Sequence, residues 1–339
     1  MTDDLIIETK NLKKSFLSKS KGQKKLVEAV KGIDLSVKKG EIYGFLGPNG
    51  AGKSTTQKML STLLPPTSGE ATINGYDLAK HKQQIRQIIG FVSQAGGTDS
   101  LSTGIENLIL QAQLYGIDTI TAKKQAAEFI DRFQMGTFVE RRATSYSGGQ
   151  RRRLDLALGM IHHPEILLLD EPTVGLDPQS RAYLWGEIKN LKEQGITVIL
   201  TTHYLDEADK LCDTLAIIDN GEIVARGTPT QLKNDIGADT VLLSFENKQI
   251  AEKTKELLMK EISAAKVQIK DNFVYLLVKD GERQLPNILR LLDTNNFEVQ
   301  SINLSKPSLD DVFLKHTGRS KMYPLSRTVL KRPYATSLR

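Results

Sequence analysis

The chain has 339 residues, of which 39% are hydrophobic and 25% charged, and this length predicts about two domains that each bury a core. The net charge is +6, but residues 319–339 hold six Lys or Arg and no acidic residue, so residues 1–318 carry 40 basic and 40 acidic residues. That even balance argues against a folded body built as an electrostatic platform for nucleic acid.

No stretch of the sequence approaches the roughly 18 consecutive apolar residues that a membrane-spanning helix needs. The first four residues include Asp3 and Asp4, and the N-terminus lacks the basic and then apolar pattern of a secretion signal. The single cysteine, Cys212, excludes an internal disulfide and a cysteine-rich metal site. We therefore expect a cytoplasmic protein.

The chain opens with segments that read as strands at the edge of a sheet, over residues 5–9, 27–30 and 33–37. The last of these alternates apolar and polar residues, which is typical of a half-buried antiparallel strand. The lysine-rich segment 18–25, between the first two of these strands, predicts a solvated hairpin tip. Phe16 precedes that tip, and it is either an edge-packing residue or a platform on which a flat base stacks.

The segment Gly47–Thr55 fits the phosphate-binding pattern Gly-x-x-x-x-Gly-Lys-Ser. Its glycines allow a tight curl in which backbone N–H groups converge on phosphate oxygens. In such loops the lysine, here Lys53, reaches the β- and γ-phosphates, and the hydroxyl, here Ser54, binds Mg²⁺. A buried strand is predicted before the loop, over residues 41–46, and a helix after it. The helix is expected to place four residues on one face and to stop at Pro65: Thr56, Met59, Leu60 and Leu63.

Further along, a strand is expected to end at Gln94, and residues 95–104 read as a loop. Helical periodicity over residues 105–135 predicts a helical insertion within an α/β domain. The segment Ser147-Gly148-Gly149-Gln150 has the spacing of a capping box, so a helix should begin there. This segment is either a capped helix alone or a second helix end that binds an anion.

Two further buried strands are predicted at residues 166–169 and 196–200. The first ends in Asp170 and Glu171, and His203 follows the second. Open α/β sheets bind ligands at the carboxyl ends of their strands, so these side chains are candidates for one site. Asp177 and Pro178 are expected to open the next helix.

A second unit begins near Gly237 and shows the order β-α-β-β-α-β, which predicts a small ferredoxin-like α+β domain. The segment 308–311 is expected to cap a short helix that runs through Leu314. This unit offers no phosphate loop, nucleophile or ligand cluster, so we expect it to be regulatory or dimer-forming. The basic tail, residues 319–339, is expected to be mobile, and it either contacts anionic lipid or is simply solvated.

Together these motifs resemble the ATP-binding cassette (ABC) ATPase family over residues 5 to about 230. The resemblance implies an α/β fold of the P-loop NTPase type, with a mixed sheet core, an antiparallel β subdomain and a helical subdomain. The expected division is an ATP-binding domain at 1–235, with its helical subdomain at about 98–160, then an α+β accessory domain at 236–318 and the tail.

The resemblance also implies roles for single residues. Glu171 would be the general base, His203 would contact the γ-phosphate, and Lys53 and Gln94 would complete the catalytic set. Mg²⁺ would be served by Ser54, Gln94 and, through water, Asp170. Phe16 would stack on adenine, and Asp177 would lie at a dimer seam. ATP would be held by the loop residues and, from a second copy, by the capping-box segment: Gly47, Pro48, Asn49, Gly50, Ala51, Gly52, Lys53, Ser54, Thr55, Ser147, Gly148, Gly149 and Gln150. Tyr146 stands where the family usually has leucine, a departure that we expect to be tolerated.

The segments 143–155, 202–209 and 307–313 look like those of daunorubicin-resistance exporter ATPases. This implies an ATP-hydrolysing subunit that dimerises around two ATP and drives efflux of a drug, lipid or polysaccharide-like substrate. Its implied partners are a second copy of itself and a separate transmembrane permease of the type-2 exporter class, with no nucleic acid. Membrane contact would be indirect, through the permease, at the inner face of the cell membrane.

The alternative is a non-transport ABC ATPase that acts on nucleic acid or ribosomes. Chromosome-type relatives place a long coiled coil between the two phosphate-binding motifs, and here only 93 residues separate Lys53 from Ser147. Translation-type relatives carry two cassettes, whereas this chain has one set of motifs. A nucleotide sensor without turnover is disfavoured by the presence of Glu171.

Overall fold

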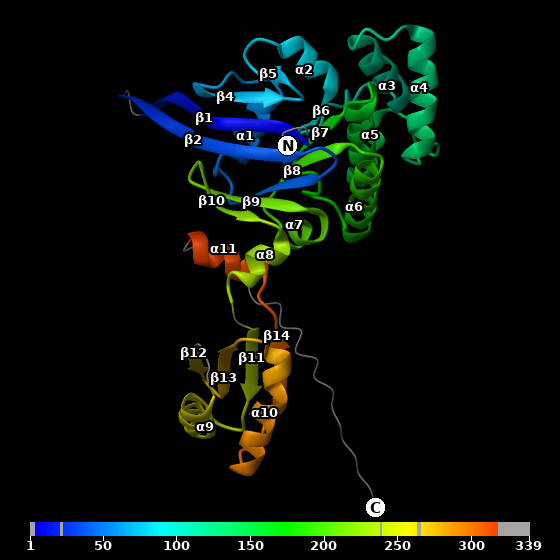
Figure 1. The fold of residues 1–339 in the computed structure, drawn as a ribbon. Coiled ribbons are helices and arrows are strands. Elements are labelled where there is room, and N and C mark those ends of the chain that lie inside the picture. The colour runs from blue at the N-terminus through cyan, green and yellow to red at the C-terminus, as the bar shows by residue number, and fades with distance from the viewer. Residues whose placement is uncertain (1–3, 21–22, 238, 263–265, 318–339) are drawn as a thin grey trace, which may run out of the picture.

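The computed structural model describes residues 4–20, 23–237, 239–262 and 266–317 (Figure 1). A larger body holds two sheets and most of the helices, and a smaller body lies beyond α8 with a third sheet. The predictions made for residues 319–339 lie outside the described residues.

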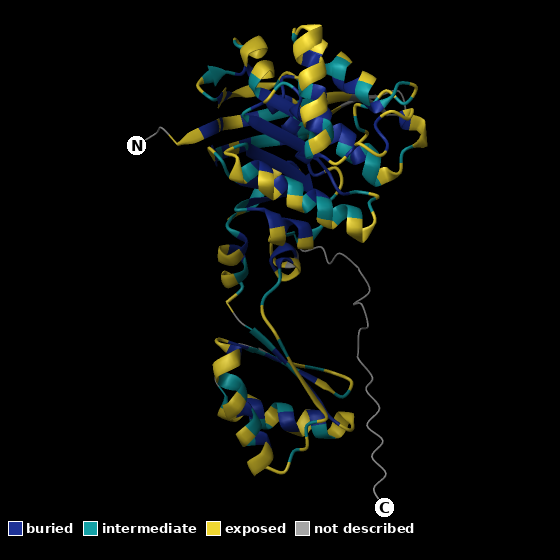
Figure 2. Cartoon of the chain, turned by 90° about the vertical axis from the view of Figure 1, so that its right-hand side faces the viewer, coloured by how far each residue is buried: buried dark blue, intermediate teal, exposed yellow. Residues whose placement is uncertain are grey.

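Six strands of the described chain form the central sheet, in the order β10-β9-β3-β8-β7-β6. Their bounds are β3 (Ile42–Leu46), β6 (Ile89–Val92), β7 (Ile166–Asp170), β8 (Thr197–Thr202), β9 (Thr214–Asp219) and β10 (Glu222–Gly227). The strands from β9 to β6 pair in parallel, and β10 pairs antiparallel with β9. Every residue of β3, β7 and β8 is buried, as Figure 2 shows, which confirms the buried strands that the sequence predicts. The parallel strands bring their carboxyl ends to one edge.

A second sheet has the order β2-β1-β4-β5. Its strands are β1 (Leu5–Ser20), β2 (Gln23–Lys38), β4 (Ser68–Ile73) and β5 (Tyr76–Asp77). The segments 27–30 and 33–37, expected as separate strands, are both parts of β2. Gly32 lies between them with a φ of 130°, and the pairing with β1 shifts register nearby. The bulge absorbs the glycine without ending the strand.

Helices lie on both faces of the central sheet, and α3 and α4 stand to one side of it (Figure 1). The helices of the larger body are α1 (Lys53–Leu60), α2 (Lys82–Ile88), α3 (Gly104–Leu114), α4 (Thr119–Arg132), α5 (Gly148–Met160), α6 (Pro178–Glu193), α7 (Leu205–Leu211) and α8 (Pro229–Asn234), with a 3₁₀ helix at Ala143–Ser145. The predicted helical insertion is the α3–α4 pair, with a break at Gly116, where φ is 83°.

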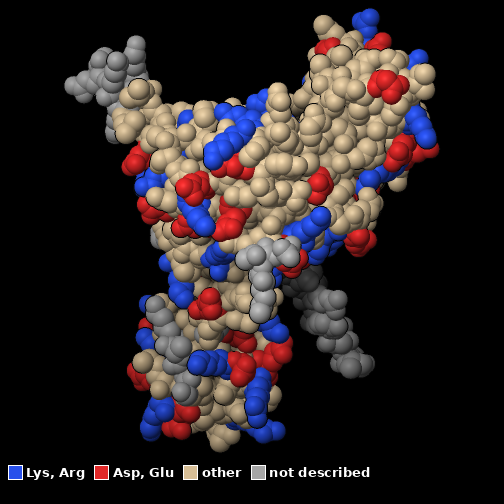
Figure 3. All heavy atoms as spheres, turned by 45° about the horizontal axis from the view of Figure 1, so that its top comes forward, with Lys and Arg blue, Asp and Glu red and all other residues tan. Residues whose placement is uncertain are grey.

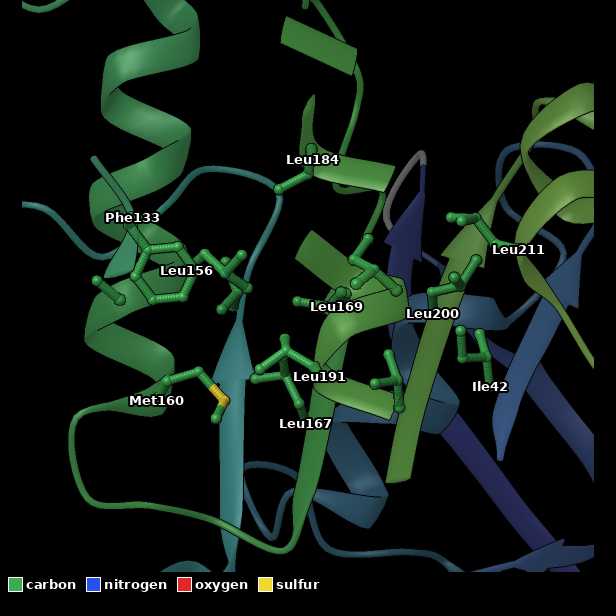
Figure 4. Close-up of a cluster of buried hydrophobic side chains, with 14 of the residues drawn as sticks. Ile42, Phe133, Leu156, Met160, Leu167, Leu169, Leu184, Leu191, Leu200 and Leu211 are labelled. Atoms are coloured by element: carbon green, nitrogen blue, oxygen red, sulfur yellow. The ribbon is translucent and has the colours of Figure 1, made fainter. Parts of the chain in front are cut away.

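Side chains of β7 alternate between two hydrophobic cores, one on each face of the sheet. Leu167 and Leu169 pack with Leu156 of α5 and Leu191 of α6 (Figure 4), whereas Ile166 and Leu168 belong to the cluster on the other face. Each fully buried side chain of this size stabilises the fold by about 1.5–3 kcal/mol. The strand that carries Asp170 is therefore held rigidly from both sides.

The helix after the phosphate loop is shorter than the sequence predicts. Thr56, Met59 and Leu60 are buried on one face, but α1 ends at Leu60. Leu63 lies beyond the helix and is 59% exposed, so the prediction that it shares a helix face with the other three residues was wrong. The chain leaves the helix through Thr62, whose φ of 63° closes the turn before Pro65 is reached.

The smaller body confirms the predicted ferredoxin-like fold. Its elements are β11 (Asp239–Ser244), α9 (Lys248–Glu261), β12 (Lys266–Lys270), β13 (Phe273–Val278), α10 (Gly281–Thr294) and β14 (Ser301–Ser305). The sheet order is β12-β13-β11-β14, and all neighbours are antiparallel.

The last described helix, α11 (Leu309–Thr317), returns to the larger body (Figure 1). Its Leu309, Val312 and Phe313 join the same buried cluster as Leu232 of α8. Ser308 caps the helix, as predicted, by accepting the Asp311 N–H at 3.3 Å. The smaller body is thus inserted between α8 and α11.

On the face shown in Figure 3, basic and acidic side chains are interspersed over both bodies. This distribution matches the even charge balance of residues 1–318. Within the described part of the chain, no helix is long and apolar enough to cross a membrane.

Candidate active site

The glycine-rich loop connects the end of β3 to the start of α1, the strand–loop–helix arrangement that the sequence predicts. Gly50 and Gly52 have φ angles of 79° and 108°, a backbone conformation that favours glycine. A Cβ atom at Gly47 would collide with the carbonyl oxygen of Ile218, and one at Gly52 with that of Ala29. The curl of the loop therefore depends on glycine at these positions.

A pocket of about 440 Å³ opens over this loop, a volume that suits a nucleotide-sized ligand. It is lined by Ala29, residues 49–55, Gln94 and Glu171. The start of α1 forms part of the wall, where backbone N–H groups without helical partners favour an anion.

Lys53 is almost fully buried at the base of the pocket, with 4% of its side chain exposed. Its ammonium group donates to the carbonyl oxygens of Gly47, at 2.8 Å, and Pro48, at 3.1 Å. It also lies 3.6 Å from Oε1 of Glu171. The loop and the carboxylate thus hold the charge of Lys53 at the base of the pocket.

Asp170 ends β7 and is bonded by two hydroxyl groups. Ser54 Oγ donates to its Oδ1 at 2.8 Å, and Thr201 Oγ1 donates to the same atom at 2.6 Å. Thr201 Oγ1 in turn accepts the backbone N–H of Glu171 at 3.0 Å. One threonine at the end of β8 therefore fixes both neighbouring carboxylate residues.

Glu171 is the meeting point of the predicted catalytic residues. Gln94 Nε2 donates to its Oε2 at 3.2 Å, and His203 Nδ1 lies 3.2 Å from its Oε1. The φ of Glu171 is 46°, a rare conformation for a side chain of this kind that costs on the order of 1 kcal/mol and clusters at functional sites. Lys53, Gln94, Glu171 and His203 thus come together at one edge of the sheet.

Phe16 lies on β1, opposite Val27 of β2, and is 40% exposed. The ammonium group of Lys14 lies 5.3 Å from the centroid of its ring. Phe16 is not part of the pocket wall among the described residues, although β2 supplies Ala29 to that wall. An adenine platform at this position remains a prediction.

The capping box at the start of α5 is confirmed. Ser147 Oγ accepts the Gln150 N–H at 3.2 Å, and Gln150 Oε1 accepts the Ser147 N–H at 3.0 Å. Ser147 and Gly148 are exposed, and in the described chain they do not line the 440 Å³ pocket. Gly148 borders a smaller hollow of about 140 Å³ that Gln94 and Glu171 also line.

Asp177 is the predicted N-cap of α6. It is exposed and accepts the hydroxyl group of Ser180 at 2.6 Å and the Ser180 N–H at 2.9 Å. These hydrogen bonds lower the pKa of the Asp177 carboxyl below its ordinary value. Asp177 lies beside the start of α5, since a Cβ atom at Gly149 would collide with the Ser180 hydroxyl group that Asp177 binds.

Tyr146 turns into the helical insertion, where its ring packs edge-on against Phe138, 4.9 Å away. Its hydroxyl group donates to the Val139 carbonyl oxygen at 3.3 Å. The side chain is thus accommodated away from the exposed Ser147, which explains how tyrosine fits where leucine is usual.

The residues of the pocket fit ATP and Mg²⁺. The glycine curl and Lys53 suit phosphates, and the pocket volume suits the whole nucleotide. Ser54, Gln94 and Asp170 offer hydroxyl, amide and carboxylate oxygens, the hard donors that Mg²⁺ prefers. Among the described residues no cluster of His, Cys, Asp and Glu could hold a metal ion by itself. A Mg²⁺ bound jointly by protein and phosphate oxygens needs no such cluster.

Sequence reasoning missed two residues of the site. Thr201 could have been found as a hydroxyl at the end of an apolar strand, two residues before His203. Arg152, on α5, donates to the carbonyl oxygens on either side of Glu171. In the sequence it stands within a run of three arginines and has no signal of its own.

A phosphate loop, a buried strand that ends in two carboxylates and a histidine at the next strand define a nucleotide hydrolase of the P-loop class. Comparison with known families agrees: the model of the family described as "ABC transporter" matches residues 30–174. A second model, "ATP-binding protein DrrA1-3-like, C-terminal domain", matches residues 227–317.

Curated relatives extend the match over most of the chain. The chain is 42% identical over 290 residues to the daunorubicin/doxorubicin resistance ATP-binding protein DrrA of Streptomyces peucetius, covering 86% of this chain and 88% of the relative. It is 36% identical to the Nod factor export ATP-binding protein I of Burkholderia orbicola (strain AU 1054), covering 86% of this chain and 92% of the relative.

Among solved structures, the chain is similar to a dimeric ATP-binding cassette, MJ0796, in a post-hydrolysis state with ADP and phosphate. The TM-score is 0.60 at 27% identity, covering 66% of this chain and 98% of the other. The chain belongs to the ABC transporter family, in the DrrA-like group. It is the ATP-binding and ATP-hydrolysing subunit of an exporter.

Proposed function

We propose that two copies of this chain close face to face around two ATP molecules, so that each site draws on both copies. The proposal is supported mainly by how the site residues are divided. Four of them come together at one pocket: Lys53, Gln94, Glu171 and His203. The exposed Ser147 and Gly148 do not line that pocket in the described chain. A second copy places its own Ser147–Gly149 helix end over the open side of the pocket. Asp177, which caps α6 beside that end, then lies at the seam.

The phosphates of ATP take the place of the contacts that now hold Lys53. The backbone N–H groups of residues 49–55 and the Lys53 ammonium group bind the phosphates. Once Lys53 turns to the phosphates, Glu171 loses one cation and its carboxylate is free to accept a hydrogen bond from water. Phe16 stacks on adenine from the hairpin that also carries Ala29.

Glu171 then polarises the attacking water as general base, and His203 orients that water toward the γ-phosphate. Ser54, Gln94 and, through water, Asp170 would hold Mg²⁺, which would neutralise charge on the phosphate oxygens. Thr201 keeps Asp170 and Glu171 in register through its two hydrogen bonds. Closure of the two copies excludes bulk water from the site.

Closure of the two copies drives a separate permease at the inner face of the membrane. The transport pathway lies in that partner, since the relatives from Streptomyces peucetius and Burkholderia orbicola are named as ATP-binding proteins. The cargo proposed is an apolar, drug-like molecule, because the relative from Streptomyces peucetius is named for resistance to daunorubicin and doxorubicin. We assign residues 1–235 to the ATP-binding domain and residues 236–318 to an accessory domain.

The test is ATP-driven uptake of fluorescent daunorubicin into inverted vesicles that contain the chain and its permease. We expect uptake with the wild-type chain and uptake near background with Glu171→Gln, which keeps ATP binding but lacks the general base. A vesicle preparation that hydrolyses ATP at the wild-type rate yet takes up no daunorubicin would refute this cargo class. Equal ATPase rates for wild type and Glu171→Gln would remove the assigned base.

A further inference from the structure

Arg152 is a buried cation that binds three main-chain carbonyl groups. It lies in the second turn of α5 and is 8% exposed. Its Nε donates to the Pro172 carbonyl oxygen at 2.7 Å, Nη1 to Ser93 at 2.9 Å, and Nη2 to Asp170 at 3.3 Å. Burial lowers the pKa of the guanidinium, and the nearby carboxylates, Asp155 foremost, partly offset this.

These three carbonyl groups frame the catalytic residues. Asp170 and Pro172 stand on either side of Glu171, and Ser93 immediately precedes Gln94. The planar guanidinium spans the ends of β6 and β7, which a single ammonium group is too small to bridge with three directed bonds. The position of Arg152 thus sets the positions of Glu171 and Gln94.

Asp155 binds the residues that follow Gln94 to the same helix. Its Oδ1 accepts the Gly97 N–H at 3.0 Å and the Thr98 hydroxyl at 2.7 Å. Gly96 has a φ of 80°, and a Cβ there would lie 2.6 Å from Asp155 Oδ2. Residues on both sides of Gln94 are therefore bound to α5, by Arg152 and by Asp155.

The N-terminus of α5 carries the exposed Ser147 and Gly148, which the proposed function places over the nucleotide of the second copy. One helix thus joins the parts that a chain contributes to two different sites. We propose that Arg152, with Asp155, is a positioning residue that makes α5 a rigid link between the two ATP sites of the dimer, so that occupation of one site orders Gln94 and Glu171 of the other. This inference rests on the proposed dimer.

The experiment measures kcat, the ATP concentration at half-maximal rate and the Hill coefficient of the full chain. Arg152→Lys keeps the charge but not the three directed bonds. We expect kcat to fall at least tenfold and the Hill coefficient to fall toward one, with the affinity for a fluorescent ATP analogue unchanged, because residues 47–55 are intact. Arg153→Lys is the matched control. Arg153 is on the same helix, and its guanidinium carbon lies 3.9 Å from the centroid of the Tyr183 ring, an interaction that lysine also makes.

Asp155 supplies a second pair of variants in case Arg152→Lys fails to fold. Asp155→Asn keeps an acceptor oxygen and is expected to retain most of the activity and cooperativity, whereas Asp155→Ala is expected to lose both. The kinetic comparison uses only variants whose thermal melting temperatures match that of the wild-type chain. If Arg152→Lys and Asp155→Ala keep the wild-type kcat and Hill coefficient, the link between the sites is refuted.

A second measurement separates failure of the proposed dimer from failure of the coupling between its sites. Light scattering of Glu171→Gln and of Arg152→Lys/Glu171→Gln in ATP reports the dimer directly, since both keep Ser147–Gly149. Dimers in both, with the expected loss of kcat and cooperativity in Arg152→Lys, support the inference. Single chains in both would overturn the proposed dimer and, with it, the coupling. Dimers with unchanged kinetics would overturn the coupling alone.

Discussion

Gly148 and Gly149 follow one another at the start of α5, yet their surroundings differ. A Cβ at Gly148 would have Leu176 Cδ2 as its nearest neighbour, at 3.8 Å, which is ordinary contact. A Cβ at Gly149 would collide with the Ser180 hydroxyl group of α6. Within one chain, therefore, the packing of α5 against α6 requires glycine at position 149. At position 148 a larger residue would meet no collision.

This difference predicts opposite effects for two alanine substitutions. Gly148→Ala should leave the free energy of unfolding unchanged or raise it by about 0.5 kcal/mol, since alanine favours the helix. Its ATPase rate should fall at least tenfold, because the methyl group lies between the helix end and the nucleotide of the second copy. Gly149→Ala should lower the free energy of unfolding by about 1–3 kcal/mol through overpacking.

Thermal unfolding and steady-state ATPase assays on both purified variants check this pair. Gly148→Ala with wild-type activity would show that the start of α5 does not approach a nucleotide. Gly149→Ala with unchanged stability would show that α5 and α6 can separate at no cost.

His162 follows the C-terminal end of α5 and contacts two other elements, α3 and β6. Its ring stacks on Tyr115, which caps the end of α3, at 3.7 Å between centroids, and Nε2–H donates to the Ile89 carbonyl oxygen of β6 at 3.1 Å. Burial lowers the pKa of His162 from 6.5 to about 4. The folded state thus favours the neutral ring at the junction of these elements.

The sign of the resulting pH dependence follows directly. Between pH 6.5 and about 4 the unfolded chain binds a proton at His162 that the folded chain does not bind, so stability is lost as the pH falls through this window. The loss should reach about 3.5 kcal/mol, because each unit of pKa shift corresponds to about 1.4 kcal/mol. His162→Phe keeps the stacking on Tyr115 and should flatten the acid limb of the unfolding curve. Parallel curves for His162→Phe and wild type would contradict this account.

At the level of elements, the sequence predicted what depends on local pattern. The apolar run of β7, the capping box of Ser147 and the Asp177–Pro178 helix start are all present. The end of α1 could not be predicted, because Leu63 continues the apolar spacing while the turn at Thr62 already closes the helix. The contacts of Arg152 could not be predicted either, since they depend on how α5 packs across the ends of β6 and β7.

Across the whole molecule, the smaller body is inserted between two helices that pack together. Val312 and Phe313 of α11 share a hydrophobic cluster with Leu232 of α8, and Lys315 donates to the Asp235 carbonyl oxygen at 2.9 Å. The strands of the smaller body have their own core, which includes Val241. The chain thus leaves the larger body at α8 and returns beside it at α11.

At this scale the proposed function depends on one assembly: a phosphate loop of one copy closed by the start of α5 of another. The most direct measurement is the mass of the Glu171→Gln chain in solution, by light scattering, with saturating ATP and with ADP. We predict twice the chain mass of 37.6 kDa in ATP and a single chain in ADP. Adding Gly148→Asp should keep the chain single in ATP, because it sets a carboxylate against the γ-phosphate. A single-chain mass for Glu171→Gln in saturating ATP would contradict the account.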